Sequence, residues 1–521
     1  MLLKNLITSQ LILMLLLGTS AALAQEDNAA SEAKRVPDAE TTAMQAVAEE
    51  DDDDENWDDE DWDDEAGEYD VEIAPEDTYS LDKCISLALQ KSHAIKAANW
   101  EVKYYDAKAD EAWWAWFPKI TVQSILTAAP DYDPPSTNNP AAFLSYSQDW
   151  YRFDGILWGN DVNLTQPLYT FGKYSSVKEM GKLGAQAGTY GKKVVENKII
   201  YEVKRVYYTL QLVERMLDVL DEGMSYVNTA EKKLNELLES GSDTVTEIDQ
   251  YKFAVVRADL LSRVEEARKN KRILVQAMRM LLTLPENAPF YLDRRYPKNP
   301  DANERFTSSS KLHEAMKGEK PELRLLDLQY KFAEEKLNLQ RAWYFPDFFL
   351  HLKYKYVTAP EMPNIDSPYL SDPYNSHYFA FFVGLNYTFD LPLQNARVKQ
   401  AEFKVNKAES EANFMKGKMR LEMEEAHATY EEKYKQFKIN ETGQKAGKKW
   451  MITAMMNYNI GLLESSNMVE SIAAYFKTEF TYYSSVHSVW CAEAKLDFLV
   501  GGEADKYKTG TDEKPQDGKI E

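Results

Sequence analysis

Few residues of this chain have the types and spacing that a catalytic or metal-binding site requires. The six histidines are scattered along the sequence, and none of them pairs with another at metal-ligand spacing or in a His-Glu-x-x-His motif. The sequence also contains no Gly-x-Gly-x-x-Gly loop, no Walker loop and no nucleophile elbow. We therefore expect a protein that is not an enzyme, with no catalytic residues, no cofactor and no bound metal ion.

Two groups of residues have both a chemical and a structural interpretation. Met451, Met455 and Met456 could handle a soft metal ion, although packing between helices explains them more simply. The tryptophan-rich run 113–116 could form a cofactor cage. It directly precedes a predicted strand, however, and aromatic side chains with a polar group are typical of a membrane interface. We favour the structural interpretation of both groups.

The first 24 residues have the pattern of an export signal. Lys4 lies near the start, an apolar run follows at 11–17, and Ala22-Leu23-Ala24 forms a small-residue cleavage site. No later stretch approaches the ~20 apolar residues that a membrane-spanning helix needs. The sequence therefore predicts an exported protein that is not a helical membrane protein.

Cys84 and Cys491 are the two cysteines of the chain. Each lies near one edge of the region that we expect to fold, and an exported protein meets an oxidising compartment. The two residues can therefore form a disulfide or remain two separate buried thiols, and the spacing does not decide between these.

The net charge of −24 is concentrated in one segment. Between Glu49 and Glu65, fourteen of seventeen residues are Asp or Glu, so the rest of the chain carries −10. A chain of this charge is a poor partner for nucleic acid. The acidic segment is interpreted either as a solvated, disordered tether or as a tail that collects cations or docks a partner through Trp57 and Trp62.

The longest regular pattern is a ladder of apolar residues between 199 and 227. The steps alternate between four and three residues, which is the seam of a coiled coil. A helix over the whole stretch from Lys173 to Ser240 would be roughly 100 Å long. The ladder consists of Ile199, Val203, Val206, Leu210, Val213, Leu217, Leu220, Met224 and Val227.

The order of predicted elements occurs twice. Phe117-Pro118 recurs as Phe345-Pro346, 228 residues on, and the same offset relates Ser92-His93 to Lys320-Pro321, where a helix begins. Each half consists of helix, strand, strand, long helix, hairpin tip and returning helix, so the chain is an internal duplication. In the first half, we expect one continuous helix from Ser80, its N-cap, toward Trp116.

These patterns divide the chain into six segments. We expect a signal peptide at 1–24, an acidic disordered segment at 25–77, a first repeat at 78–285, a connector at 286–309, a second repeat at 310–502 and a polar tail at 503–521. The expected strands lie at about 119–128, 160–169, 347–358 and 378–390, and the hairpin tips at about 240–246 and 460–466. The second long helix is expected from about Asn395 to Asn459.

The four strands are apolar on one side and polar on the other. In 378–389, for example, Phe379, Phe381 and Val383 share one face, whereas Ala380 and Gly384 lie on the other. This pattern fits either a soluble sheet on a core or the wall of a transmembrane barrel. The heptad patterns predict that the helices pack against one another. No element then remains to cover the apolar faces of the strands, which favours the barrel.

Four strands cannot close a barrel by themselves. A sheet can cross a membrane only as a closed barrel, and known barrels start at about eight strands. Two chains would supply eight strands and leave a filled interior, whereas three would supply twelve, enough to leave an aqueous channel. A conduit therefore favours three or more chains.

The order of elements and several local signatures resemble the TolC family of outer membrane efflux proteins. The matching residues are the segment 81–95, the two Phe-Pro junctions, the strand 163–169 followed by Gly172, and the glycines at both tips. The resemblance covers about residues 78–502. It implies a mainly helical fold with β-strands, in which a trimeric 12-stranded outer-membrane β-barrel continues into a periplasmic α-helical coiled-coil barrel.

The resemblance also implies location and partners. Proteins of this family lie in the outer membrane of Gram-negative bacteria and extend into the periplasm. They assemble as homotrimers in outer-membrane lipid and work with a periplasmic adaptor protein and an inner-membrane pump of the RND or ABC type. We expect the same partners here, and no nucleic acid.

The hairpin tips carry the site residues that the resemblance implies. In related proteins a glycine-containing turn at each tip meets the adaptor, which assigns this role to Ser240, Gly241 and Ser242 and to Ile460, Gly461 and Leu462. Acidic residues near the tips often form a ring at the periplasmic aperture, and the candidates are Glu464, Glu470, Asp243, Glu247 and Asp249. Glu464 and Glu470 can equally be ordinary carboxylates that favour the helix dipole near an N-terminus, and for Asp243, Glu247 and Asp249 we favour this ordinary interpretation.

Three functional hypotheses follow. The leading one is a passive export duct that the pump energises. A secreted coiled-coil scaffold with a soluble β-cap is the alternative from another class. A third hypothesis keeps the duct but assigns it to protein secretion or metal-ion efflux, because in this family the pump largely sets the cargo.

Overall fold

The computed structural model describes most of the chain between residues 78 and 502. The described residues are 78–130, 153–240, 246–293, 299–300, 306, 309–362, 364, 372 and 374–502, all within one compact unit that spans 72–521. The expected signal peptide, the acidic segment and the polar tail lie outside the described residues. So do three of the expected tip residues, Gly241, Ser242 and Asp243.

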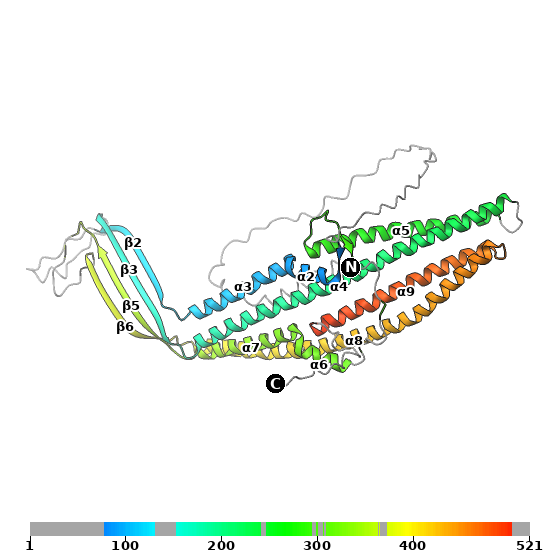
Figure 1. Ribbon diagram of the computed structural model, residues 1–521. Coiled ribbons are helices and arrows are strands. Elements are labelled where there is room, and N and C mark those ends of the chain that lie inside the picture. The colour runs from blue at the N-terminus through cyan, green and yellow to red at the C-terminus, as the bar shows by residue number, and fades with distance from the viewer. Residues whose placement is uncertain are drawn as a thin grey trace, which may run out of the picture. The chain divides into compact units, whose positions relative to one another are not determined.

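Two copies of one arrangement of helices and strands follow each other along the chain (Figure 1). The first copy contains β1 (Thr78–Tyr79), α2 (Leu81–Lys91), α3 (His93–Trp114), β2 (Lys119–Pro130), β3 (Phe153–Tyr169), α4 (Lys173–Glu239) and α5 (Glu247–Leu282). The second contains β4 (Tyr291–Leu292), α6 (Ser309–Glu319), α7 (Pro321–Ala342), β5 (Asp347–Thr358), β6 (Ser376–Asn386), α8 (Leu391–Asn459) and α9 (Ser465–Val500). The predicted duplication and the mainly helical fold with antiparallel strands are confirmed.

The repeats also match in length. Helices α3 and α7 have 22 residues each, strands β2 and β5 have 12 each, and the returning helices α5 and α9 have 36 each. The long helices α4 and α8 have 67 and 69 residues. Helix α8 begins at Leu391, before the expected Asn395, because Pro392 is compatible with a first helical turn.

The expectation of one continuous helix from Ser80 toward Trp116 is wrong. Ser80 caps α2 as predicted, with its side chain accepting a hydrogen bond from the Lys83 N–H. The helix then ends at Ser92, whose ψ of 133° is not helical. The Ser92 N–H donates to the Ala88 carbonyl, and its Oγ accepts from the Ala94 N–H, so one serine both ends α2 and starts α3.

Four strands form one antiparallel sheet at one end of the long helices (Figure 1). Their order is β2-β3-β5-β6, so the pairing of β3 with β5 joins the two repeats, and β2 and β6 are the edges. Strand β3 begins at Phe153 instead of 160, since β2 continues to Pro130 and pairs with this extension. Strand β6 ends at Asn386 instead of 390, because its partner β5 begins at Asp347 and offers nothing to pair beyond.

The register places apolar side chains of all four strands on one face. Directly paired residues of antiparallel strands point to the same side, so Val122, Val162, Tyr354 and Phe379 form one apolar row across the sheet. The next row contains Ile120, Leu164, Leu352 and Phe381. In this chain the face is open, with Val122 68% and Phe381 71% exposed.

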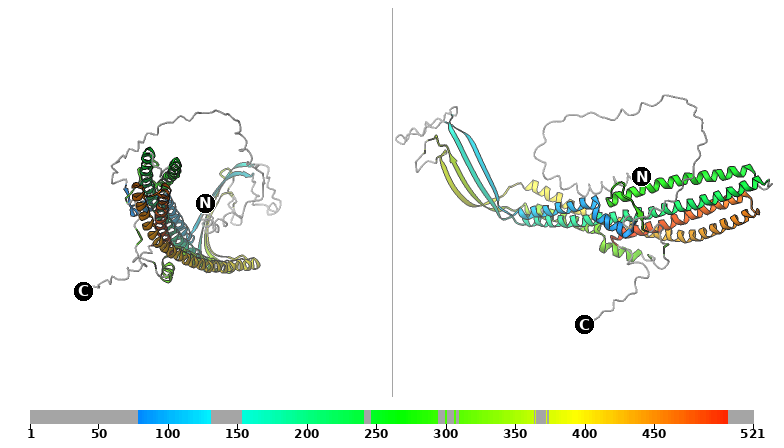
Figure 2. Two further views of the ribbon diagram at one scale, coloured as in Figure 1. Left: turned by 90° about the vertical axis from the view of Figure 1, so that its right-hand side faces the viewer. Right: turned by 45° about the horizontal axis from the view of Figure 1, so that its top comes forward.

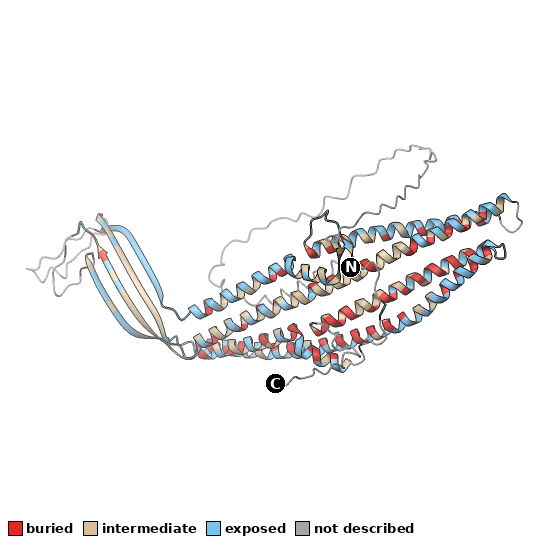
Figure 3. Cartoon of the chain, in the orientation of Figure 1, coloured by how far each residue is buried: buried red, intermediate tan, exposed pale blue. Residues whose placement is uncertain are grey.

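The long helices pack side by side in a curved layer (Figure 2). Helix α4 contacts α5 on one side and α9 on the other, and α9 packs against α8, which gives the order α5-α4-α9-α8. Buried residues concentrate where these helices face one another (Figure 3). Among the described residues, no helix combines the length and the apolar character that crossing a membrane demands.

The apolar ladder of α4 is buried only in part. Five of its nine members are buried, and the other four, Val206, Val213, Leu217 and Met224, are half-buried. The reason is that α4 packs against helices on both of its sides, so its buried residues divide between two seams. Gly223, which lies outside the ladder, lets the ring of Phe476 on α9 approach the α4 backbone closely.

Candidate functional site

The second hairpin tip is a closed helix-ending turn. Helix α8 ends at Asn459, and Gly461 then adopts a left-handed conformation with φ +76°. The Gly461 N–H donates to the Tyr458 carbonyl at 3.0 Å, and the Leu462 N–H donates to the Asn457 carbonyl at 2.9 Å. This pair of bonds is a Schellman motif, which strongly prefers glycine at this position. Gly461 is therefore required by the backbone of the tip.

The two apolar residues beside Gly461 point into solvent. Ile460 is 69% exposed and Leu462 is 76% exposed. The turn uses only their backbone groups, and a Cβ added at Gly461 would meet no atom within 4 Å. The second tip is therefore an open surface with two apolar side chains that the fold of this chain does not use.

The acidic candidates after the second tip are both exposed. Glu464 is the N-cap of α9, and its carbonyl accepts the N–H groups of Asn467 and Met468, whereas its side chain makes no capping bond. Glu470 lies in the second turn of α9. Neither carboxylate forms an ion pair within 4 Å with a described residue. Both are available to solvent or a partner.

The first tip is described on its two flanks only. Ser240 ends α4, with its N–H donating to the Glu236 carbonyl and its Oγ donating to the Leu237 carbonyl. Gly241, Ser242 and Asp243 lie outside the described residues, so the structure leaves their assigned roles untested.

Asp249 has the contacts of a helix cap. It accepts hydrogen bonds from the Thr246 N–H at 3.0 Å and from the Thr246 Oγ1 at 3.1 Å, and Lys252 Nζ lies 3.0 Å from its other oxygen. Burial raises the pKa of Asp249, but the hydrogen bonds from Lys252 and Thr246 outweigh it and hold the pKa below its ordinary value. Its neighbour Glu247 is exposed in the same first turn. Of the two carboxylates, Glu247 is the freer to meet a solute.

One apolar cluster holds the two hairpins together below their tips. It contains residues of all four long helices, including Leu234 of α4, Phe253 of α5, Tyr458 of α8 and Met468 of α9, each at most 1% exposed. The two tips are thus carried by one packed unit. The residues assigned to them fall into two groups, one at the end of each hairpin.

The methionines and cysteines do not form a site. Met451 is buried in the cluster below the tips and Met456 is exposed, so the methionines do not converge. Cys84 and Cys491 are both free thiols. Burial raises the pKa of Cys84 to about 12 and that of Cys491 to about 11. Such thiols are almost entirely protonated and unreactive at neutral pH.

A polar cluster between α4, α8 and α9, buried at its centre and open at Glu222, was not predicted from the sequence. Its centre is Glu479, which is 1% exposed and accepts a hydrogen bond from Gln444 Nε2 at 2.8 Å. On α4, Arg215 lies 3.3 Å from Glu222, and Glu222 in turn accepts a bond from the Tyr475 hydroxyl at 3.2 Å. An ionisable group thus lies inside the contact between the two hairpins.

A pattern in the sequence would have located Glu479. Helix α9 carries a ladder with steps of four and three residues, like that of α4, and every member is buried. Glu479 and Glu493 are the two acidic members, so they stand at seam positions where an apolar residue is normal. The ladder consists of Met468, Ile472, Tyr475, Glu479, Tyr482, Val486, Val489, Glu493, Leu496 and Val500.

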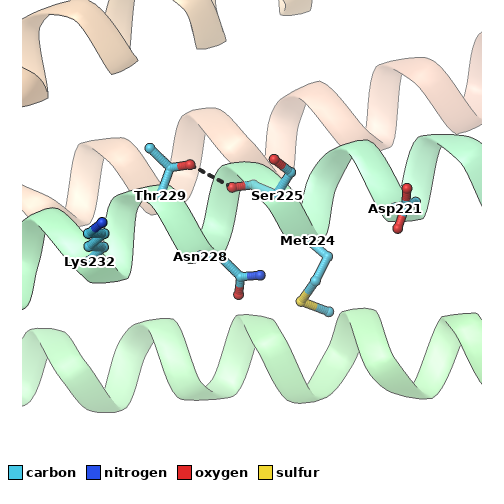
Figure 4. Close-up of a pocket in the computed structure, with 6 residues that line it drawn as sticks. All are labelled: Asp221, Met224, Ser225, Asn228, Thr229 and Lys232. Carbon is cyan, nitrogen blue, oxygen red and sulfur yellow. Dashed lines mark hydrogen bonds between the residues drawn. The ribbon is translucent and has the colours of Figure 1, made fainter. Parts of the chain in front are cut away.

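The surface of α4 also carries a shallow polar groove of about 380 Å³ (Figure 4). Its lining is one face of the helix, where Asn228 and Met224 point toward the neighbouring α5 ribbon and Thr229 Oγ1 donates to the Ser225 carbonyl. Asp221 and Lys232 are its only charged residues and lie three turns apart. Among the described residues, no three His, Cys, Asp or Glu side chains could share a metal ion.

The sequence matches one protein-family model, over part of the described region. The family model described as "Outer membrane efflux protein" matches residues 84–278. Among curated proteins, no relative matches the sequence.

Solved structures with the same fold are outer-membrane proteins, among them two outer-membrane channels. The CmeC channel of Campylobacter jejuni is 15% identical with a TM-score of 0.67, and the match covers 81% of this chain and 85% of CmeC. VceC of Vibrio cholerae is 12% identical with a TM-score of 0.66, covering 81% and 96%. The open state of the Neisseria gonorrhoeae MtrE channel is 15% identical with a TM-score of 0.60, covering 81% and 89%.

Proposed function

We propose that this protein is the outer-membrane exit duct of a tripartite efflux or type I secretion system. Two findings support the proposal: residues 84–278 match the outer membrane efflux protein family, and the fold is that of the TolC family. In this proposal the protein is an outer membrane efflux channel with a periplasmic extension and not an enzyme, as the matched family model and the shared fold suggest. Within the tripartite system it acts as a passive conduit, which opens when a periplasmic adaptor and an inner-membrane pump dock.

The observation that carries the proposal is the two-sided sheet. Its apolar face is continuous across β2, β3, β5 and β6, and it is open in this chain. An exposed apolar face of this extent would drive aggregation in water, whereas it matches the lipid-facing side of a barrel wall. The edges β2 and β6 have no further partner among the described strands. Other copies of the chain must supply one.

A homotrimer gives each edge a partner and closes the sheet. Three copies bring twelve strands, enough to leave an aqueous lumen. The helices offer matching contact surfaces, because exposed apolar residues form one stripe on α5 and another on α8, the outer members of the helical layer. On α5 the stripe is Ile248, Val255, Ile273 and Met280, and on α8 it is Phe403, Phe414, Leu421, Ile439 and Trp450.

The spacing within each stripe supports this assignment. The steps of 7, 11 and 18 residues are close to whole numbers of turns, so each stripe runs straight along its helix. Such a stripe in a soluble segment calls for a partner. Because α5 has 36 residues and α8 has 69, we assign the tip-side part of the α8 stripe of one copy, Ile439 and Trp450, to the α5 stripe of the next, and the rest of the α8 stripe to the surface of the next copy beyond α5.

The tips are assigned to adaptor docking. Ile460 and Leu462 present apolar side chains around a rigid turn, which suits the end of a partner helix. Ser240, Gly241 and Ser242 are proposed for the same role at the first tip. Glu464 and Glu470, with Asp243, Glu247 and Asp249, remain the proposed acidic residues of the periplasmic aperture, and the exposed Glu464, Glu470 and Glu247 fit it better than the capping Asp249.

Bilayer recording tests the duct itself. Purified protein added to a planar lipid bilayer is expected to produce discrete conductance steps, and it should be extracted from cells only with detergent. A monomeric, water-soluble protein without conductance would contradict the proposal and favour the secreted coiled-coil scaffold.

Replacing the glycine of the second tip tests docking. Gly461→Leu places a bulky residue at a positive φ, which costs on the order of 1–2 kcal/mol locally and distorts the turn. We expect efflux in cells to fall by roughly tenfold or more while the trimer remains intact, since tenfold corresponds to about 1.4 kcal/mol of binding. Gly443→Leu is the control, because Gly443 is helical and also has open space around its Cβ position. Unchanged efflux with Gly461→Leu would remove the docking role.

A further inference from the structure

The polar face of the sheet is not neutral. Three lysines, Lys119, Lys353 and Lys355, lie on it, and we call them the lysine belt. We propose that the lysine belt makes the outer-membrane segment of the lumen an electrostatic filter that favours anionic solutes. This inference rests on the proposed function of the protein as a duct. The filter lies in series with the acidic aperture proposed at the periplasmic end, and has the opposite sign.

The register puts the belt on the side opposite the apolar rows. Lys119 pairs with Thr165, and Thr165 pairs with His351, so these three residues form one row across the sheet. The next row on the same face lies two residues further along each strand and contains Asn163 and Lys353. The row after that contains Asp161 and Lys355. In a barrel with its apolar face toward lipid, these three rows face the lumen at successive levels.

Few carboxylates offset the lysines. Asp161 lies 3.7 Å from Lys353 Nζ and is paired directly across the ladder with Lys355. The other carboxylate on this face, Asp347, lies at the end of β5 and is bound by Lys173 at 2.9 Å. Lys119 and Lys355 have no ion-pair partner within 4 Å among the described residues. The belt therefore leaves two uncompensated positive charges in each chain.

The size of the lumen makes these charges effective. Strands spaced ~4.8 Å apart and tilted by ~40° give a twelve-stranded barrel a backbone radius of about 12 Å. The Debye length is about 10 Å at 0.1 M salt, so the potential of the wall reaches most of the lumen. Rings of Lys or Arg are the arrangement by which pores favour anions. The solute class that this belt favours is therefore small inorganic anions and organic solutes with carboxylate, phosphate or sulfate groups.

The test is the ion selectivity of the full-length protein in planar bilayers. The reversal potential is measured under a tenfold KCl gradient around 0.1 M and converted to the chloride-to-potassium permeability ratio. Replacing the belt with Lys119→Gln, Lys353→Gln and Lys355→Gln should lower that ratio by about threefold or more, and Asp161→Asn should raise it. Both differences should shrink at 1 M KCl, where the Debye length is about 3 Å.

The controls separate this inference from the proposed function. Lys96→Gln removes the same charge from an exposed position on α3 and should leave the ratio unchanged. If the triple variant does not assemble, Lys355→Gln alone provides the test, because no ion pair of Lys355 is lost, and the ratio should still fall. A wild-type protein that never conducts would refute the duct. Channels whose ratio is the same in wild type and belt variants would refute the belt and leave the duct standing.

Discussion

Single residues in this chain have clear local tasks where a helix ends. Gly461 closes α8 with a φ that other residues rarely adopt, and the Asp249 carboxylate accepts hydrogen bonds from the N–H and the hydroxyl of Thr246 at the start of α5. Glu479 is different, because it is an acidic side chain inside the seam between the hairpins. Burying its carboxylate costs free energy, and the positive charge of the nearby Arg215 offsets only part of that cost.

Glu479 should make stability depend on pH. Burial raises its pKa, and the hydrogen bond from Gln444 and the charges of Arg215 and Lys448 oppose the rise, while Glu222 adds to it. Because the folded pKa lies above the unfolded value, the stabilisation is fully present below the unfolded pKa and is lost as pH rises through the folded pKa. Glu479→Gln keeps a hydrogen-bonding side chain without the charge, so it should stabilise the protein by about 1 kcal/mol at neutral pH.

Thermal unfolding in detergent at pH 5 and pH 8, followed by circular dichroism, measures this effect. The wild type should lose more stability between these two pH values than Glu479→Gln. Glu470→Gln removes an exposed carboxylate from the same helix and should behave as wild type. If Glu479→Gln lowered the unfolding midpoint at both pH values, the attraction of the carboxylate to the charges of Arg215 and Lys448 would outweigh the cost of its burial.

At the scale of elements, the sheet and the helices follow two different periods. Alternation by two divides each strand into an apolar side and a polar side, and the 4-3 ladders of α4 and α9 place their residues in the seams of the layer. The two systems meet at short junctions. Lys173, the first residue of α4, binds the Phe345 carbonyl and the Asp347 carboxylate of the other repeat. This contact joins the start of a helix to the start of a strand.

Neighbouring residues of β2 should differ strongly in how far the same added charge destabilises the protein. Val122 lies on the apolar face and Thr121 on the polar face. Val122→Lys should therefore cost about 2–4 kcal/mol if the residue lies near the middle of the bilayer, whereas Thr121→Lys should cost little. Denaturant unfolding from lipid vesicles, or the yield of folded protein in the outer membrane, gives the difference. Equal effects of the two variants would mean that β2 does not have one face in lipid.

At the scale of the whole molecule, the single chain leaves two kinds of surface uncovered. The edges β2 and β6 are unpaired within the described sheet, and the apolar stripes of α5 and α8 are uncovered. Both features lie on the outer members of their layers, so one closed ring of copies would cover them together. A homotrimer is the smallest ring that also leaves a lumen.

Phe414→Asp should weaken that ring without unfolding the chain. Phe414 is 72% exposed, so an aspartate there meets solvent in the isolated chain but an apolar surface in the assembly. We expect a lower trimer fraction in detergent by light scattering, with the helical content unchanged. Asn413→Asp introduces the same charge at the neighbouring exposed position and should leave the trimer intact. An unaffected trimer in Phe414→Asp would exclude the α8 stripe from the interface.

Much of the fold could be predicted because the signals are local. A repeated residue spacing acts through neighbours a few positions apart, so it predicted the long helices, the strands and the cap at Ser80. The duplication followed from equal spacing of the Phe-Pro junctions. The site was less predictable. Gly461 was identified through its turn, whereas the acidic candidates depend on where each carboxylate points in the assembled tip.

The remaining features required contacts between distant parts of the chain. Ser92 ends one helix and starts the next although the apolar pattern runs through it, because capping bonds there replace helical ones. The extent of β3 and β6 depends on where their partner strands begin, and the two seams of α4 depend on helices far away in sequence. The sequence by itself determined the periodic elements, because their signals lie within a few turns. Only the tertiary structure decided which face each element covers and which it leaves for another copy, since that choice belongs to packing.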